Sequence, residues 1–482
     1  MKYNTKKKVV SGVFWNGIQL VINQSFAFLI RLILAKLLFP EQFGIIGMAT
    51  LFTGFVQVCN DLGIGAALIQ RKEETLTKAH FHTAFWTGVA WSTFLYLIIS
   101  FALAPVAAIF FKEPILTILI PVLSIGILSS PVNLVHKAQL TKAMDFKTIG
   151  FVENISSIAA GCVALALAYF GAGVWSLAFN SVAAIFIAMP LYFKATKWKP
   201  ALTWNQKAFK EIFGFGIYTT GTSIVNYFIN HIDYLLIGKL LSAQALGAYT
   251  FAFILTDVFR SRLSAVLNNV MYPVYGKNQN DPKSLKNYYL KVINYNSILV
   301  FPIMTFFLVL GRPFVFQFFG DKWAGSIEPL QILSLSVMVH MLVNSNTALI
   351  RGMGRPKLEL KLQLIKAVIF IPMLVYGIVY YGIVGGAWAI LINKVIAVAI
   401  AQYTFNYLLF LKVSFLEFFA AVKYPWLGAL SSYLTAFILF KGLGVPYLVA
   451  GFFLFVVYFL TIWVNMRSEL SKIINAYKLS GK

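Results

Sequence analysis

The chain of 482 residues carries little charge and very few cysteines. Only 12% of its residues are charged, and 16 acidic residues stand against 40 lysines and arginines. The two cysteines, Cys59 and Cys162, cannot build a disulfide framework. Because both fall within apolar runs, we expect two free, buried thiols. A chain this poor in charge leaves little material for a soluble domain.

Catalytic and nucleotide-binding motifs are also missing. The sequence has no GxxxxGK(S/T) phosphate loop, which excludes a built-in ATPase of that type, and it has no HExxH, CxxC or GxSxG. Gly352 and Gly354 lie in a polar turn and do not form a dinucleotide-binding loop. We therefore expect that the protein is not an enzyme and that it needs no metal and no cofactor.

Long apolar runs dominate what is present, since 59% of the residues are hydrophobic. A bilayer core needs about 20 apolar residues per helix, and about fourteen such runs follow one another. The runs are continuous rather than alternating, which favours helices over a barrel. We predict an all-α polytopic membrane protein. The predicted spans are 10–34, 42–69, 80–111, 114–138, 148–170, 173–193, 211–237, 243–272, 290–311, 326–350, 361–381, 384–409, 417–440 and 445–466.

The net charge of +24 is distributed unevenly between the loops. Alternate loops and both termini hold about 29 lysines and arginines, and the loops on the opposite side hold about six. Because cytoplasmic loops accumulate these residues, this bias predicts that both termini are cytoplasmic. The same bias accounts for the basic composition, so we expect no nucleic-acid partner.

The two halves of the chain resemble each other. LFPEQFG (38–44) and LSAQALG (241–247) each lie between a first and a second span. The pair Trp175 and Asn180 matches the pair Trp388 and Asn393 in spacing, and TKAMDFK (141–147) corresponds to RGMGRPK (351–357). This order predicts a parallel repeat of two six-helix lobes, with the substrate site between them. The predicted divisions are 1–208, 209–412 and a final pair of helices with a tail at 413–482.

Ionisable and amide side chains recur inside the predicted spans, where each charge costs several kcal/mol and usually faces the bundle interior. Many fall 3, 4 or 7 residues apart on one helix face, which favours a water-filled cavity. Hydrogen bonding between helices, an Asp257–Arg260 ion pair within one helix, or snorkelling of Arg31 are the alternatives. The candidate substrate-binding residues are Arg31, Arg260, Arg262, Lys394, Asn23, Asn226, Asn230 and Asn344. The candidates for ion coupling are Asp233, Asp257 and Asp61. Lys366 and Glu153 are further ionisable residues within spans.

Several motifs together resemble one family. They are LAKLLFPEQFGIIGMA (34–49), DLGIGAALIQR (61–71), FGFGIYTTGTSIVNYFINHIDYLLIGKLLSAQALGAY (213–249) and ALIRGMGRPKLE (348–359). The chain resembles the Wzx-like polysaccharide transporters, of the colanic and teichuronic acid exporter type, within the multidrug/oligosaccharidyl-lipid/polysaccharide (MOP) exporter superfamily. The resemblance implies two six-helix lobes in a V, with two further helices at the C-terminus. It also implies arginines on the first and eighth spans that contact a diphosphate.

The function implied by this resemblance is a flippase in the bacterial cytoplasmic membrane. Its cargo would be an undecaprenyl-diphosphate-linked oligosaccharide for extracellular polysaccharide or lipopolysaccharide biosynthesis. The partners would include membrane lipid, the polysaccharide polymerase and glycosyltransferases. Buried arginines suit such an anionic cargo, because the guanidinium fork matches phosphate. A multidrug or cation antiporter, a peptidoglycan-precursor flippase and a membrane enzyme remain the alternatives. An antiporter would need more acids in its cavity than this chain offers.

Overall fold

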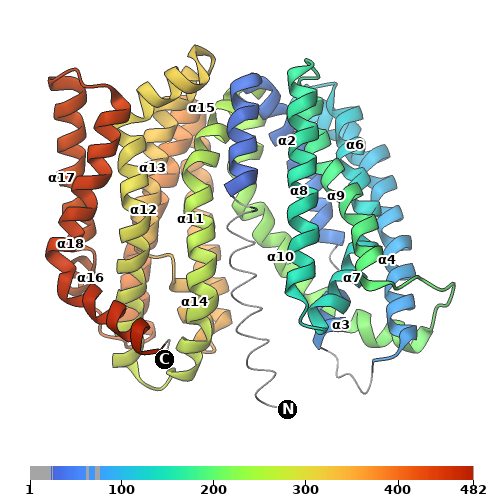
Figure 1. Cartoon of the computed structure of the whole chain (residues 1–482). Helices are drawn as coiled ribbons and strands as arrows, with labels where there is room; N and C mark the ends of the chain where they lie inside the picture. The colour runs from blue at the N-terminus through green and yellow to red at the C-terminus, as the bar shows by residue number, and fades with distance from the viewer. Residues whose placement is uncertain (1–22, 24, 61–63, 71–75, 481–482) are drawn as a thin grey trace. The chain divides into compact units, whose positions relative to one another are not determined.

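The computed structural model describes residues 23, 25–60, 64–70 and 76–480. All the regular elements in these ranges are helices. The chain divides into two compact units (Figure 1), unit 1 at Met1–Gly247 and unit 2 at Ala248–Lys482. Each unit is a bundle of long helices.

In unit 1, caps and glycines set the ends of the helices. The Asp145 carboxylate accepts a hydrogen bond from the Thr148 N–H (3.1 Å) and begins α8. Gly171 and Gly173 both have positive φ, and they turn the chain from α8 into α9, which packs along it. The elements are a helix at 25–37, α2 (Pro40–Asn60), α3 (Ile64–Gln70), α4 (Lys78–Ile98), the π-helical turn η2 (Ile99–Leu103), α5 (Ala104–Phe111), α6 (Leu116–Leu128), α7 (Ser130–Lys142), α8 (Phe146–Tyr169), α9 (Val174–Thr196), α10 (Gln206–Leu240) and the start of α11 (Ala243–Lys277).

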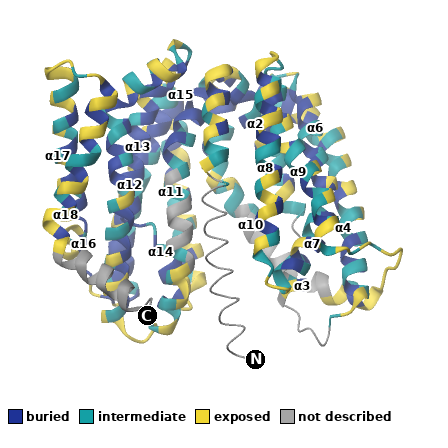
Figure 2. Cartoon of the chain, viewed as in Figure 1, coloured by how far each residue is buried: buried dark blue, intermediate teal, exposed yellow. Residues whose placement is uncertain are grey.

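Unit 2 is built around α12, which packs against α13, α17 and α18 and is buried along much of its length (Figure 2). Asp281 caps its first turn through the N–H groups of Lys283 and Ser284, both at 3.1 Å. After α11, the elements are α12 (Pro282–Phe319), the 3-10 turn η3 (Asp321–Ser326), α13 (Ile327–Met341), α14 (Asn346–Gly352), α15 (Pro356–Tyr403), η4 (Thr404–Leu408), α16 (Phe415–Ala421), α17 (Lys423–Phe437), η5 (Ile438–Gly442) and α18 (Tyr447–Ser480).

Within α15, two helices follow each other with a reversal at Gly382, whose φ of 61° and ψ of −146° are not helical. Only glycine adopts this conformation without strain. The two arms approach closely, because a Cβ on Gly385 would lie 1.9 Å from the Gly377 carbonyl oxygen. The predicted boundary between the spans 361–381 and 384–409 therefore coincides with a real turn.

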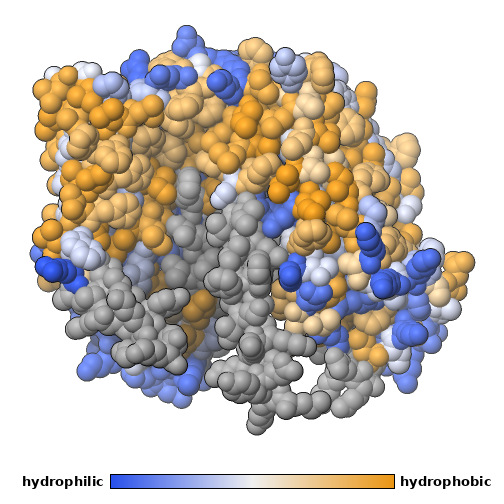
Figure 3. Space-filling view, in the orientation of Figure 1, coloured by the Kyte–Doolittle hydropathy of each residue, from blue (hydrophilic) through white to orange (hydrophobic). Residues whose placement is uncertain are grey.

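The surface of the helices is apolar, as expected of a chain that faces lipid. Phe101, Ile109 and Val368 are 77%, 78% and 72% exposed, which a water-soluble surface rarely tolerates in such numbers. On both units, hydrophobic residues cover the middle of the helices and hydrophilic residues gather near their ends (Figure 3). In the described part of the chain, nine helical stretches are long and apolar enough to cross a membrane. The protein is an all-helical, polytopic membrane protein.

The predicted span 114–138 corresponds to one apolar helical stretch, Leu116–Lys142, in which Ser129 separates α6 from α7 and Pro131 follows in the first turn of α7. The expectation of two buried thiols is wrong for Cys162, which is exposed on α8, while Cys59 is half-buried on α2. Apolar sequence predicts membrane depth, but it does not say which side of a helix faces lipid.

Candidate functional site

Three basic side chains of unit 2 lie within electrostatic range of one histidine. They lie on two helices, Arg260 on α11 and both Lys366 and Lys394 on α15, and all three are half-buried. Their charges act through space on the ring of His340, which belongs to α13. Arg260, Lys366 and Lys394 are called the cation cluster below. Two of its members are predicted substrate-binding residues.

Lys366 is the member that sequence reasoning did not assign to the site. It lies before the Gly382 reversal and Lys394 lies after it, so the hairpin brings both lysines to the same helix, α13. The sequence contained a clue to this arrangement. Lys366 and Lys394 lie at similar distances before and after the glycine-containing boundary between two predicted spans, so a turn at this boundary brings them back toward each other.

An acid partly balances the cation cluster. The Arg260 Nε donates a hydrogen bond to Asp257 Oδ1 (2.7 Å), and the Arg260 Nη2 contacts the same oxygen. The side chains of Arg260 and Asp257 are 26% and 23% exposed. The ion pair within one helix, which the spacing of the two residues suggested, is confirmed. Asp257 therefore belongs to the same group of charges as Arg260.

Amide groups near the cation cluster have unused hydrogen-bonding capacity. Asn268 donates to the Asn344 carbonyl (3.3 Å), yet its own Oδ1 is buried without a partner among the described residues. The same holds for His340 Nδ1, Asn344 Nδ2 and Asn393 Oδ1. Buried polar atoms are nearly always paired, so water or a polar ligand is needed to satisfy this group.

The predicted span 326–350 is interrupted beside these amides. Residues 342–345 separate α13 from α14, and tyrosines from two helices hold the break. Tyr275 Oη lies 3.0 Å from Ser345 Oγ, and Tyr289 Oη donates to the Leu342 carbonyl over 3.0 Å. The segment between the two helices is a tight turn with hydrogen bonds from Leu342 to Val339 and from Val343 to His340, so α13 and α14 form one apolar stretch with a local irregularity beside Asn344.

In unit 1, the candidate residues differ in their exposure. Arg31 and Asn230 are exposed, whereas Asn23 and Asn226 are half-buried. Asp233 is buried (6% exposed), and its Oδ1 accepts a hydrogen bond from the Tyr234 N–H (2.9 Å). Asp61 and the side chain of Arg262 lie outside the described residues. Glu153 is exposed and forms an ion pair with Lys137.

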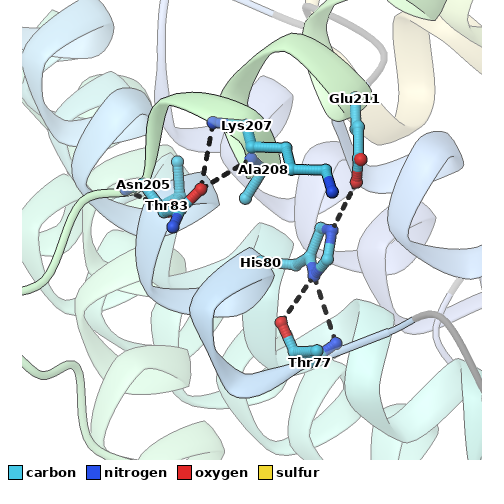
Figure 4. Close-up of polar contacts among 7 residues, drawn as sticks. All are labelled: Thr77, His80, Thr83, Asn205, Lys207, Ala208 and Glu211. Carbon is cyan, nitrogen blue, oxygen red and sulfur yellow. Dashed lines mark hydrogen bonds and ion pairs between the residues drawn. The ribbon is translucent and has the colours of Figure 1, made fainter.

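A polar cluster in unit 1, which the sequence analysis missed, joins the start of α10 to the start of α4 (Figure 4). His80 is buried, its Nδ1 accepts from the Thr77 N–H (3.1 Å), and its Nε2 lies 3.0 Å from Glu211 Oε2. Because a backbone N–H faces Nδ1, the ring proton is on Nε2, which donates to the carboxylate. Nearby, the Asn205 N–H donates to Thr83 Oγ1 (3.0 Å). The sequence pattern that could have revealed this cluster is the capping box of Thr77 and His80, in which histidine replaces the usual Glu or Gln.

A helical membrane protein with half-buried cations and unsatisfied amides within its spans has the features of a transporter for a polar, anionic molecule. The family described as polysaccharide biosynthesis protein matches residues 33–328, and the chain belongs to this family.

Curated relatives cover most of the chain at low identity. The lipopolysaccharide biosynthesis protein WzxC of Escherichia coli is 24% identical over 404 residues, which is 83% of this chain and 81% of that protein. The teichuronic acid biosynthesis protein TuaB of Bacillus subtilis is 24% identical over 447 residues, covering 89% of both proteins. The succinoglycan biosynthesis transport protein ExoT of Rhizobium meliloti is 22% identical over 404 residues, or 83% of this chain and 81% of that protein.

Two solved structures share the fold. The lipid II flippase MurJ in an inward closed conformation aligns with a TM-score of 0.74 at 14% identity, over 94% of this chain and 99% of that one. An inward-facing multidrug transporter of the MATE family, within the MOP superfamily, aligns with a TM-score of 0.62 at 15% identity, over 83% of this chain and 100% of that one. These similarities place the chain in the MOP fold.

Proposed function

We propose that this protein is a flippase that moves undecaprenyl-diphosphate-linked oligosaccharides across the bacterial cytoplasmic membrane by alternating access. The cation cluster in unit 2 is the observation that carries the proposal. A diphosphate brings about two negative charges, and the three basic side chains of the cation cluster are of the opposite sign. The names of WzxC, TuaB and ExoT, which refer to polysaccharide biosynthesis or transport, support the same cargo class.

In the proposed site, charged side chains and amide side chains have separate roles. Arg260, Lys366 and Lys394 attract the diphosphate, and the guanidinium fork of Arg260 can bind two phosphate oxygens once it releases Asp257. Asn344 and Asn393 offer a donor and an acceptor to sugar hydroxyls, because their buried amide atoms are unsatisfied. Arg31 and Asn23 on the first predicted span, Asn226 and Asn230 on α10, and Arg262 on α11 are the further proposed substrate-binding residues.

The proposed architecture has 14 membrane-spanning helices, with lobes at 1–208 and 209–412, two helices at 413–482 and both termini in the cytoplasm. The three matching pairs of repeat motifs and the distribution of lysines and arginines support it. The polymerase and the glycosyltransferases of the same polysaccharide are the proposed partners, because they act immediately after and before flipping.

Membrane potential is the proposed driving force. Moving negative charge outward across an inside-negative membrane releases about 2.3 kcal/mol per charge per 100 mV. Asp233 and Asp257 are the proposed coupling residues if an ion is also carried, together with Asp61. A cation antiporter fits less well, since the site has more cations than acids.

Binding of purified protein tests the cargo class. The melting temperature in detergent should rise with an undecaprenyl-diphosphate-linked oligosaccharide, because a ligand that binds the folded state stabilises it. The rise should fall in Lys366→Ala and Lys394→Ala but remain in Lys361→Ala, a matched change of an exposed lysine on the same helix. Stabilisation by an organic cation instead would overturn the proposal. Equal stabilisation by lipid II would assign the protein to peptidoglycan-precursor transport.

A further inference from the structure

The connection between α9 and α10 is fixed to α4 through its backbone. Residues 197–205 form this connection, which Figure 1 shows as a green loop that projects from the ends of the helices of unit 1. The Ala201 N–H donates a hydrogen bond to His82 Nδ1 (3.0 Å), and the Ala201 carbonyl oxygen accepts one from Trp86 Nε1 (2.8 Å). Because side chains of α4 satisfy both backbone groups of Ala201, this residue has a defined position on unit 1.

Two tryptophans attach the rest of the connection to the same helix. The Trp198 ring stacks on the ring of His82, with 5.2 Å between the ring centroids. Trp204 Nε1 donates a hydrogen bond to Thr87 Oγ1 (3.3 Å). The connection is therefore held on α4 before, at and after Ala201.

Between these attachments the chain makes a tight turn with an apolar tip. The Thr203 N–H donates to the Ala201 carbonyl oxygen (2.7 Å), which closes the turn around Leu202. The side chain of Leu202 is 88% exposed, and Trp204 beside it is 56% exposed. The anchored turn thus presents a leucine and a tryptophan to the surroundings of unit 1.

Exposed lysines flank this tip along the chain. The segment 194–210 contains five lysines and no aspartate or glutamate, and all five lysines are exposed. Lys197, Lys199 and Lys207, which are called the tip lysines below, lie at most five residues from Leu202. Among the described residues, none of the tip lysines forms an ion pair. Their charges are therefore available to an anionic ligand.

The position of the connection relative to α9 favours lipid over a water-soluble partner. α9 has 23 residues, so at about 1.5 Å per residue it is about 35 Å long and exceeds the hydrocarbon core of about 30 Å. The residues directly after Thr196 consequently begin at the level of the lipid headgroups. A cluster of lysines that immediately follows a membrane span, together with tryptophan, is typical of binding to anionic lipids.

We propose that residues 197–207 form a binding site for the headgroups of anionic phospholipids in the cytoplasmic leaflet. The tip lysines bind the phosphates, and Leu202 and Trp204 enter the apolar layer beneath the headgroups. Each lysine near an anionic surface strengthens such binding by about fivefold. The contacts with α4 order the turn before the lipid binds, which lowers the entropic cost of binding.

The depth of a spin label in the bilayer tests this proposal. In a variant with Cys59 and Cys162 changed to Ala, Thr203→Cys would carry the label in nanodiscs of phosphatidylcholine, with or without phosphatidylglycerol. Phosphatidylglycerol should lower the accessibility of the label to a water-soluble nickel complex several-fold, and high salt should restore it by screening. The nanodiscs hold no cargo and expose both leaflets, so the result depends neither on the proposed function nor on the orientation of the protein.

Two sets of three substitutions separate the site from the net charge of the protein. Replacing all three tip lysines should abolish the response to phosphatidylglycerol without changing the melting temperature, and the substitutions are Lys197→Gln, Lys199→Gln and Lys207→Gln. The control removes the same charge at exposed lysines of unit 2 and should retain the response, through Lys277→Gln, Lys283→Gln and Lys357→Gln.

Three results would overturn the proposal. One is equal accessibility of the label in neutral and anionic nanodiscs, which would leave the tip lysines to an acidic protein surface. The second is a response to phosphatidylglycerol that survives replacement of the tip lysines. The third is a response that both sets of substitutions reduce equally, because it would then depend only on the net charge.

Discussion

Substitutions at Arg260 and Asp257 test how much one charge of the cation cluster contributes. Arg260 now donates two contacts to Asp257 Oδ1, and in transport it would exchange this acid for phosphate oxygens. A hydrogen bond to a charged group contributes about 1.5–3 kcal/mol net. Arg260→Ala should therefore raise the substrate concentration at half-saturation by about 10- to 150-fold. Arg260→Lys should give an intermediate loss, because it keeps the charge and loses the fork.

Asp257→Asn should have the opposite effect on binding. The substitution removes the acid that balances Arg260, so the net positive charge of the cation cluster grows by one. The substrate concentration at half-saturation should therefore fall. The maximal rate should also fall, because release of the cargo slows. The assay is flipping of a labelled lipid-linked oligosaccharide in proteoliposomes over a range of substrate concentrations. Wild-type kinetics in Arg260→Ala would refute the assignment of the cation cluster. Complete loss of transport in Asp257→Asn at every concentration would instead make Asp257 an ion-coupling residue.

Three further predictions concern stability and topology. Gly385→Ala should lower the melting temperature by about 2–10 °C, because its Cβ would overlap the Gly377 carbonyl oxygen; an unchanged value would contradict the tight hairpin. The hydrogen bond from Lys286 lowers the pKa of Glu417 in the folded protein. The pair therefore stabilises the fold at pH values above the unfolded-state pKa of about 4.3. This stabilisation is lost as the pH falls through the lower folded-state pKa. Glu417→Gln should therefore show a smaller drop in melting temperature between about pH 5 and 3 than the wild type, and an equal drop would count against the pair. A reporter fused at Lys322 should be read outside the cell, and a cytoplasmic signal there would overturn the proposed topology.

The sequence predicted the helical membrane class and the position of the Gly382 reversal, because both depend on local composition. Apolar length alone defines a span, and the apolar run over 361–409 is too long for a single one. The break at residues 342–345 was not predicted, since the apolar run continues through it and the stabilising partners, Tyr275 and Tyr289, come from distant helices.

The break also divides the polar residues of this predicted span, because spacings of 3, 4 and 7 align side chains only along an uninterrupted helix. His340 lies before the break and Arg351 lies after it. After the break, Arg351 is exposed and forms an ion pair with Glu359 instead. In contrast, the Asp257–Arg260 pair was predictable because both residues lie on one unbroken helix, α11.

The most direct test of the account measures flipping under an imposed membrane potential. Purified protein in proteoliposomes would receive a fluorescent undecaprenyl-diphosphate-linked oligosaccharide, with potential and pH gradient imposed separately. The account predicts transport that follows the potential, is strongly reduced by Lys394→Ala and is retained by Lys361→Ala. Transport that follows only the pH gradient, or that survives Lys394→Ala unchanged, would contradict it.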